Sequence, residues 1–492
     1  MNVPSGGPLR SILVLGDGPV GLSAALAFAR ALPRTAVALV ATPSRPAALA
    51  DRLPAMLPAT LNVLDRLGLG EDDLLRAGAA THRLADRFVD WRDDASDWLH
   101  GFGDTGLPID GAAFHHHWIE ARRARVAAPF HAFSPAIALA AADRFAPPAD
   151  DPDALLSRFG YALRLEPGAA RHLLATRARA SGVAILPGPV SAVSRSADGT
   201  ASAVTLPDGR TLSPDLFIDC SGSTALLGDA GGWESWADAL PIDRLLLAAT
   251  PGTPALLDQY RAVETGWRAS WPMRNQRLIG LGYAAAVTSE ARARRIMGTT
   301  GAAAEAIAFS PGRQRQPWRG NVLALGDAAV ATGPMGWTGL AVAHADLASA
   351  LDLLPGCDLQ PLLLAEYNRR AALRAGRVRD FLALHHLAAK RRAGPFWRAA
   401  GNATLPPDLA LTLATFKRSG HLPRFEQELF DKQSWLSVLL GLGILPERRH
   451  ATAKALDSAV LGSTLARLQA DIAALPAHLP SYADYLGRRQ AA

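Results

Sequence analysis

Three glycines near the N-terminus have the spacing that brings a polypeptide backbone close to a phosphate group. Gly16, Gly18 and Gly21 lie in LGDGPVGLSAALAFAR, residues 15–30, between an apolar run and a helical pattern. The first glycine permits a tight turn, the second lets the backbone approach a pyrophosphate, and the third allows close packing of helix on strand. The N-terminus of that helix then faces the negative charge. The pattern predicts dinucleotide binding, and a glycine-rich turn without a ligand is the alternative.

The elements around these glycines follow the order that the motif requires. SILVL (11–15) predicts a buried strand, residues 19–31 a helix, and AVALVA (36–41) a second strand, which together make a βαβ unit. Ala41 stands where an acidic side chain normally holds the ribose hydroxyls. Because an alanine side chain accepts no hydrogen bond, we expect the adenosine half to be held loosely, with affinity weakened about tenfold.

A second glycine-containing stretch, GDAAVATGPMGWTGL (326–340), follows a predicted strand at 321–327 and leads into a helix that begins near Gly339. Backbone amides at such a helix start can stabilise negative charge on the pyrimidine end of a reduced flavin. A strand–loop–helix crossover without a ligand is the alternative. Together with the first loop, the predicted cofactor contacts are Asp327, Pro334, Gly336, Thr338 and Gly339.

Bulk properties narrow the class of protein. With 492 residues, 49% of them hydrophobic and 20% charged, the chain predicts a globular protein with a large core in two lobes or domains. The net charge of +6 comes almost wholly from arginine spread along the chain, and without a basic tract it predicts no nucleic-acid partner. No run approaches the 18 apolar residues of a membrane span. Two cysteines, Cys220 and Cys357, fit a reducing cytoplasm.

Histidine and serine residues offer weaker signals. His115, His116 and His117 are consecutive, so their side chains cannot converge on one ion in regular structure, and no neighbouring ligand completes a site. We therefore predict no metal. His385 and His386 are interpreted in the same way. Ser221 and Ser270 lack a His/Asp arrangement for nucleophilic catalysis.

Ordered motifs along nearly the whole chain resemble the flavin-dependent tryptophan halogenases. Besides the glycine loop they are THRLADRFVDW (81–91), LHGFG (99–103), FHHHW (114–118), DLFIDCSG (215–222), GWRASWP (266–272), RQPWRGNVLALGDAA (315–329), YNRRAALRAGRVRDFLALHH (367–386), SWLSVLLGLG (434–443) and LPSYADYL (479–486). The resemblance implies an α/β fold with a Rossmann-like FAD-binding module of the flavin hydroxylase type. It also implies a module at 1–350 intergrown with a β-containing substrate lobe, and a helical region at 351–492 that completes the substrate pocket.

Three positions depart from what the resemblance implies. The family lysine that carries activated halogen aligns with Arg83, whose guanidinium does not readily lose a proton. The family glutamate aligns with Gly336. In the family's W-x-W-x-I-P signature, Trp267 matches, Ala269 replaces the second tryptophan and Trp271 takes the isoleucine position. We predict Arg83, Trp267 and Trp271 as residues of the reaction centre, and a partition between flavin and substrate that Ala269 and Gly336 make thinner.

The resemblance places His100 and Phe102 against an aromatic substrate, with Trp435 as an opposing ring; aromatic core packing is the alternative. Cys220-Ser221-Gly222 follows the halogenases and lacks the Asp-Gly motif that couples FAD to a nicotinamide cofactor. A separate flavin reductase is therefore the expected partner. The expected substrate is an aromatic small molecule or peptide. The sequence is also compatible with a homodimer.

Three functions remain at this point. The first is a two-component monooxygenase that uses reduced FAD and oxygen on an aromatic substrate. The second is a halogenase for an indole or phenol, with halide as co-substrate and Arg83 holding the hypohalous acid. The third is a catalytically degenerate flavin-binding protein, suggested by Ala41, Arg83 and Gly336 together.

Overall fold

The computed structural model describes residues 7–43, 47–94, 96–196, 200–228, 232–354, 356, 359–389, 391 and 393–491; Cys357 lies outside them. The chain divides into two compact units. The first comprises Met1–Ala80, Arg164–Asp243 and Ile307–Arg379, and the second comprises Thr81–Leu163, Arg244–Ala306 and Asp380–Ala492. The chain passes from one unit to the other five times. Four passages lie within β4 (Ala80–Arg83), β7 (Ala162–Leu165), β18 (Glu305–Ala308) and α10 (Pro361–Leu387), and the fifth lies between Asp243 and Arg244.

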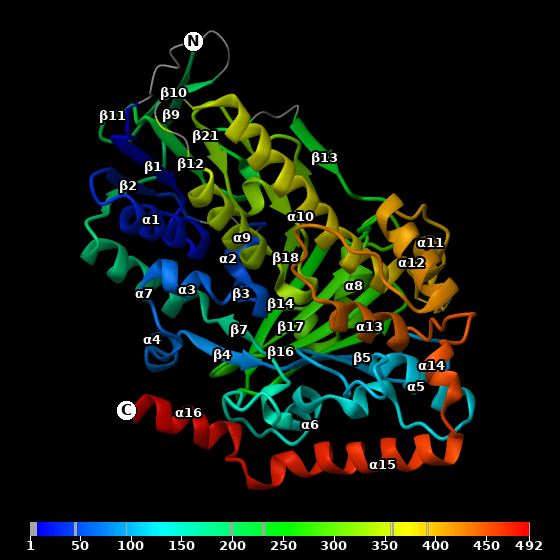
Figure 1. Cartoon of the computed structure of the whole chain (residues 1–492). Coiled ribbons are helices and arrows are strands. Elements are labelled where there is room, and N and C mark those ends of the chain that lie inside the picture. The colour runs from blue at the N-terminus through cyan, green and yellow to red at the C-terminus, as the bar shows by residue number, and fades with distance from the viewer. Residues whose placement is uncertain are drawn as a thin grey trace, which may run out of the picture. The chain divides into compact units, whose positions relative to one another are not determined.

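A mostly parallel sheet is the centre of the first unit (Figure 1). Its strands, in order across the sheet, are β20 (Trp318–Arg319), β21 (Val322–Ala324), β12 (Leu216–Asp219), β1 (Ser11–Leu15), β2 (Ala36–Ala41) and β8 (Ala184–Pro187). Strands β1, β2, β8, β12 and β21 pair in parallel, and only β20 runs antiparallel to its neighbour. The carboxyl ends of parallel strands share one edge, which is where open α/β sheets bind ligands.

Helix α1 (Pro19–Ala31) begins directly after the first glycine loop. Proline at its first position has the backbone angle that a helix start requires, and residues 19–28 are all buried. The helix packs against α7 (Pro167–Ala180) and α9 (Gly339–Asp352). The predictions of β1, α1 and β2 are confirmed to the residue.

Smaller elements complete the first unit. They are α2 (Leu49–Arg52), β3 (Ala55–Met56), α3 (Val63–Leu67), α4 (Glu71–Arg76), the sheet of β9 (Ala192–Arg195), β10 (Ala201–Thr205) and β11 (Thr211–Leu212), and the sheet of β13 (Trp233–Ser235), β19 (Gly312–Gln314) and β22 (Val330–Ala331). Residues 58–67 do not form one continuous helix. Thr60 Oγ1 accepts a hydrogen bond from the amide of Leu57, which closes a short 3₁₀ turn, and α3 follows separately.

The second unit contains a seven-stranded, largely antiparallel sheet. Its order is β18, β14 (Arg244–Pro251), β17 (Gln276–Tyr283), β16 (Gly266–Pro272), β15 (Leu257–Val263), β5 (Ala85–Val89) and β6 (Trp98–Gly101). Strands β5 and β15 are the parallel exception. That pairing comes from strands far apart in the sequence, and it decides which side chains of the candidate site lie opposite one another.

Helices make up most of the rest of the second unit (Figure 1). They are α5 (Phe114–Arg123), α6 (Pro135–Ala141), α8 (Glu290–Met297), α11 (Pro395–Gly401), α12 (Pro407–Ser419), α13 (Lys432–Gly441), α14 (Ala451–Ala455), α15 (Ser458–Ala474) and α16 (Tyr482–Ala491). Among the described residues, none of the helices combines the length and the apolar character needed to cross a membrane.

Candidate functional site

The glycines of the first loop touch neighbouring atoms too closely for side chains. A Cβ on Gly16, whose φ is +117°, would lie 2.4 Å from the carbonyl oxygen of Cys220. A Cβ on Gly21 would lie 2.1 Å from the carbonyl oxygen of Gly16. The loop therefore turns tightly between the strand and the helix, as a phosphate-binding loop must.

A carboxylate lies at the helix N-terminus beside this loop. The amide of Val20 donates a hydrogen bond of 2.9 Å to Oδ1 of Asp51, which is buried. A Cβ on Gly18 would lie 2.2 Å from Cγ of Asp51. The carboxylate thus accepts from a first-turn amide of α1, one of the groups that stabilise a bound phosphate. Sequence analysis missed Asp51 because it lies in a four-residue helix outside any recognised motif.

Asp327, from the second loop, adds another acid close to Asp51. Its Oδ2 accepts a hydrogen bond of 2.7 Å from the amide of Ala50. Burial raises the pKa of Asp327 to about 7, and the charge of Asp51 adds to the effect. The negative charge beside the glycine loop therefore changes near neutral pH.

This titration predicts that flavin binds more tightly at pH 6 than at pH 8. The folded-state pKa of Asp327 is raised, so its carboxyl is neutral below about pH 7 and charged above it. A bound pyrophosphate raises that pKa further, and each further unit makes binding up to about tenfold tighter at the lower pH. Equilibrium titration with FAD across this range measures the effect. Asp327→Asn removes the dependence, and a flat profile in the parent protein contradicts the prediction.

The second loop has an unusual backbone. Pro334 precedes a short 3₁₀ turn in which Gly336 has φ of +70° and the buried Trp337 has φ of +55°. A Cβ on Gly339 would lie 2.9 Å from the Cβ of Ala50, so the start of α9 packs directly on α2. Left-handed backbone costs other residues about 1–2 kcal/mol. A glutamate at 336 would therefore be strained as the loop stands.

The end of β2 offers a hydroxyl in place of an acid. Ala41 is the last residue of the strand, and Thr42 follows it. The Oγ1 atom of Thr42 is buried and has no hydrogen-bond partner within the described part of the chain. Such a group is costly unless something satisfies it. Its place at the carboxyl end of β2 fits a contact to a ribose hydroxyl.

In the second unit, strand pairing places two carboxylates side by side. Asp258 on β15 and Asp86 on β5 are register partners, and both are buried. Arg83 lies against both: its Nη1 is 3.3 Å from Oδ2 of Asp258 and 3.7 Å from Oδ1 of Asp86. Two buried acids need a cation, and Arg83, 1% exposed, supplies it.

The environment keeps Arg83 charged. Burial by itself lowers its pKa, but the charges of Asp86 and Asp258 outweigh burial and raise the pKa above its ordinary value. The ring of Phe102 lies over the guanidinium, with Cζ 5.2 Å from the ring centroid. Arg83 is therefore a buried cation that two carboxylates hold in its charged form.

Tyr260 occupies the space beside Ala269. The two are register partners on β15 and β16, and the Tyr260 ring lies edge-on to both Trp267 and Trp271. The indole of Trp271 donates a hydrogen bond of 3.1 Å to the Tyr260 hydroxyl. Both tryptophans are fully buried, 1% and 0% exposed. The Tyr260 ring on the neighbouring strand therefore packs where the small side chain of Ala269 leaves room.

The predicted substrate residues lie in one aromatic cluster. His100 meets Phe102 edge-on, with centroids 5.3 Å apart, and Phe381 on its other side at 5.8 Å. Phe381 in turn contacts Trp435 at 5.2 Å and stacks on Phe430 at 3.8 Å. His100 and Trp435 are thus joined through Phe381.

His100 is the polar group of that cluster. Burial lowers its pKa to about 4, so the imidazole is neutral at physiological pH. Its Nε2 is buried and has no hydrogen-bond partner in the described chain, while its Nδ1 lies 3.8 Å from Asp86. A neutral imidazole with one open nitrogen can bind a substrate hydroxyl or N–H group.

Comparison with known proteins decides the family. Residues 11–458 match the family described as tryptophan halogenase. The chain belongs to the tryptophan halogenase family. RebH, the tryptophan 7-halogenase of Lentzea aerocolonigenes, is 25% identical over 497 residues, covering 90% of this chain and 91% of RebH.

Solved structures of this family agree over nearly the full length. BrvH, a flavin-dependent halogenase from Brevundimonas sp. BAL3, is 32% identical with a TM-score of 0.90, covering 98% of this chain and 99% of BrvH. Xcc4156, a flavin-dependent halogenase from Xanthomonas campestris, is 29% identical with a TM-score of 0.90, covering 98% of both chains. Membership confirms the predicted family, fold class and enzyme class. The family uses FAD that a separate flavin reductase reduces.

Several residues of the candidate site were missed by sequence analysis. Asp86 and Asp258 are 172 positions apart, and only the parallel pairing of β5 with β15 shows that they share a cation. Tyr260 lies in none of the quoted motifs, and Phe381 lies within the motif at 367–386 without having been singled out as a site residue. The available signal was the set of two arginines and two aspartates among the apolar residues of the run at 81–91.

Proposed function

We propose that this family member is an FAD-dependent monooxygenase that transfers one oxygen atom to an aromatic substrate. The observation that carries the proposal is Arg83, which the pair Asp86 and Asp258 holds as a buried cation. When bound, reduced FAD supplies two electrons to O₂, so that one oxygen atom enters the substrate and the other leaves as water.

The chemistry of Arg83 argues against transfer of a halogen through this position. A lysine amine can lose its proton and take up an electrophilic halogen, whereas a guanidinium stays protonated. The two carboxylates strengthen that preference because they raise the pKa of Arg83. The position of the family glutamate holds Gly336, in a left-handed backbone conformation. Neither group of the usual pair is therefore present.

One set of residues would bind the cofactor, and another set would bind the substrate. The amides of the first loop and the hydroxyl of Thr42 would hold the dinucleotide half of FAD, and the loop at 334–339 would hold the flavin end. Phe102 and Trp435 would stack on an aromatic substrate, each ring pair contributing about 0.5–1.5 kcal/mol beyond buried area. The open nitrogen of His100 would orient a phenol hydroxyl or an indole N–H.

Halogenation is the second candidate, favoured by the 32% identity to BrvH over 98% of this chain. In that case Arg83 would hold hypohalous acid by hydrogen bonding, and halide would be a co-substrate. A homodimer and a cytoplasmic location stay predictions under either function.

Product mass separates the two candidates. The protein is supplied with FAD, a flavin reductase, O₂ and a panel of phenols and indoles, with and without bromide. We expect a product heavier by one oxygen atom, labelled from ¹⁸O₂ and independent of bromide. A bromide-dependent product supports halogenation instead. Hydrogen peroxide as the sole product, across the whole panel, excludes both and leaves the degenerate flavin binder.

Arg83→Lys provides the matched variant, because it keeps a positive charge but restores an amine. We expect Arg83→Lys to gain no bromination activity, because Asp86 and Asp258 would hold the lysine ammonium in its charged form. Bromination by Arg83→Lys alone, absent in the parent protein, contradicts Arg83 as the holder of hypohalous acid.

A further inference from the structure

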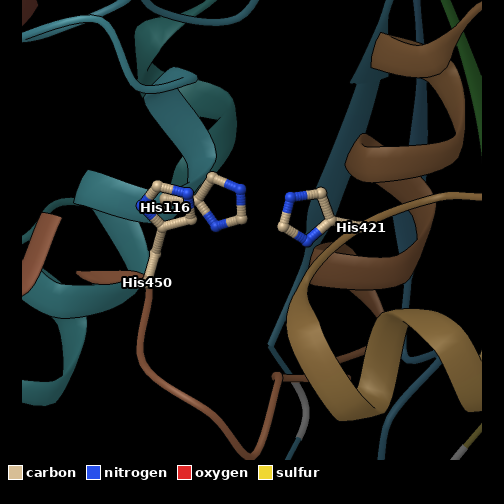
Figure 2. Close-up of side chains that lie close together, drawn as sticks. All are labelled: His116, His421 and His450. Carbon is tan, nitrogen blue, oxygen red and sulfur yellow. The ribbon is translucent and has the colours of Figure 1, made fainter. Parts of the chain in front are cut away.

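Three histidines from distant parts of the sequence meet in the second unit. His116 lies on α5, His421 follows α12, and His450 directly precedes α14. One ring nitrogen from each lies within 4.8 Å of the others. Figure 2 shows the ring of His421 facing the other two rings. Consecutive histidines at 115–117 gave no sign of this, because only His116 contributes.

Contacts made by other side chains hold the three segments together independently of these rings. Nε2 of His115 is 2.9 Å from the carbonyl oxygen of Gly420, which ends α12 in a left-handed conformation. Glu120, also on α5, forms ion pairs with Arg123 and with Arg449, the neighbour of His450. These contacts therefore hold the backbones of the three histidines close together before any ligand binds.

The ring nitrogens are left for a ligand. Nδ1 of His450 is buried and has no hydrogen-bond partner among the described residues. His116 is only 6% exposed, and its ring stacks on that of His450 with centroids 4.1 Å apart. His421 is exposed, and its Nδ1 lies 3.2 Å from the carbonyl oxygen of Ser419. That contact leaves its Nε2 as the metal-binding atom, because a ligating histidine typically donates its other N–H to an oxygen.

We propose that His116, His421 and His450 bind a divalent transition metal, of which Zn²⁺ is the natural probe. Three imidazoles with water as a fourth ligand make a tetrahedral site, in which ligand nitrogens about 2.0–2.1 Å from zinc lie about 3.4 Å apart. Because a bound metal lies in the plane of each ligating ring, the stacked rings of His116 and His450 would turn out of their stack, and the exposed side chain of His421 would move toward them. The metal would link α5 to the segments that precede α13 and α14, so it would stabilise the helical part of the second unit.

One neighbouring charge opposes this site. The ammonium of Lys432, at the start of α13, is close enough to act electrostatically on His115 and His116. A bound cation would be repelled by it. Removal of this charge should therefore strengthen metal binding, whereas removal of a ligand histidine should weaken it.

The experiment uses the full chain, purified without a histidine tag and treated with a chelator. Zn²⁺ is titrated by calorimetry and by thermal unfolding. We expect one site per chain and a rise in Tm on addition of zinc. His421→Ala and His450→Ala should each weaken binding at least tenfold, whereas His478→Ala, on an exposed side chain elsewhere in the unit, should not change it. Lys432→Gln should tighten binding.

His421→Ala keeps the experiment independent of folding, because that side chain is exposed. If the parent protein binds no zinc at micromolar concentrations, the proposal is wrong. It is also wrong if His421→Ala binds as tightly as His478→Ala, since zinc would then be bound elsewhere. Neither result bears on the oxygenation experiment, which needs no metal.

Discussion

Asp51→Asn is expected to tighten the binding of FAD, oxidised or reduced, by about tenfold or more. In the parent protein the carboxylate of Asp51 takes the hydrogen bond from the Val20 amide at the start of α1, beside Gly18. A pyrophosphate bound to the same helix start meets a negative charge. Two unit charges about 4 Å apart repel by about 4 kcal/mol at an effective dielectric constant of 20, so a tenfold effect, about 1.4 kcal/mol, is a conservative expectation.

Asparagine removes only the charge, because it keeps the size of the side chain and one oxygen acceptor for the Val20 amide. Anaerobic titration of reduced FAD, followed by tryptophan fluorescence, gives the Kd. Asp65→Asn, an exposed carboxylate on α3 of the same unit, controls for a general loss of negative charge. Equal Kd values for the parent and Asp51→Asn would show that flavin phosphate does not approach this helix start.

Arg83→Met is expected to lower the free energy of unfolding by about 3–5 kcal/mol at pH 7. The variant leaves Asp86 and Asp258 opposite each other on paired strands, buried and without their shared cation. The loss should shrink as the pH falls, because protonation of either carboxyl relieves the repulsion. Urea unfolding at pH 7 and pH 5 measures both effects.

Arg87→Met is the matched control on the same strand. Arg87 pairs with Asp97, but its side chain is 44% exposed, so the expected loss is below about 1 kcal/mol. The double variant Arg83→Met with Asp258→Asn should recover part of the stability, because one buried charge is gone. If Arg83→Met costs no more than Arg87→Met, the two carboxylates do not depend on Arg83.

The sequence by itself determined the N-terminal βαβ unit and the family of the protein. The βαβ unit over residues 11–41 was predicted to the residue, because apolar runs, a glycine loop and a helix-starting proline are all local signals. Ordered motifs along the chain identified the family, and the same motifs predict that arginine and glycine stand where the family has its lysine and glutamate. Those conclusions need only residue types and spacing, and spacing is what a linear sequence preserves.

Tertiary structure alone decided what surrounds those residues. Strand pairing over 172 positions brings Asp86 to Asp258 and gives Arg83 its partners. The four-residue helix α2 brings Asp51 to a loop 31 positions earlier in the chain. The three histidines of the proposed metal site come from segments up to 334 positions apart, from His116 to His450. Such contacts follow from burial and pairing across the whole fold, and a local pattern of residues carries no record of them.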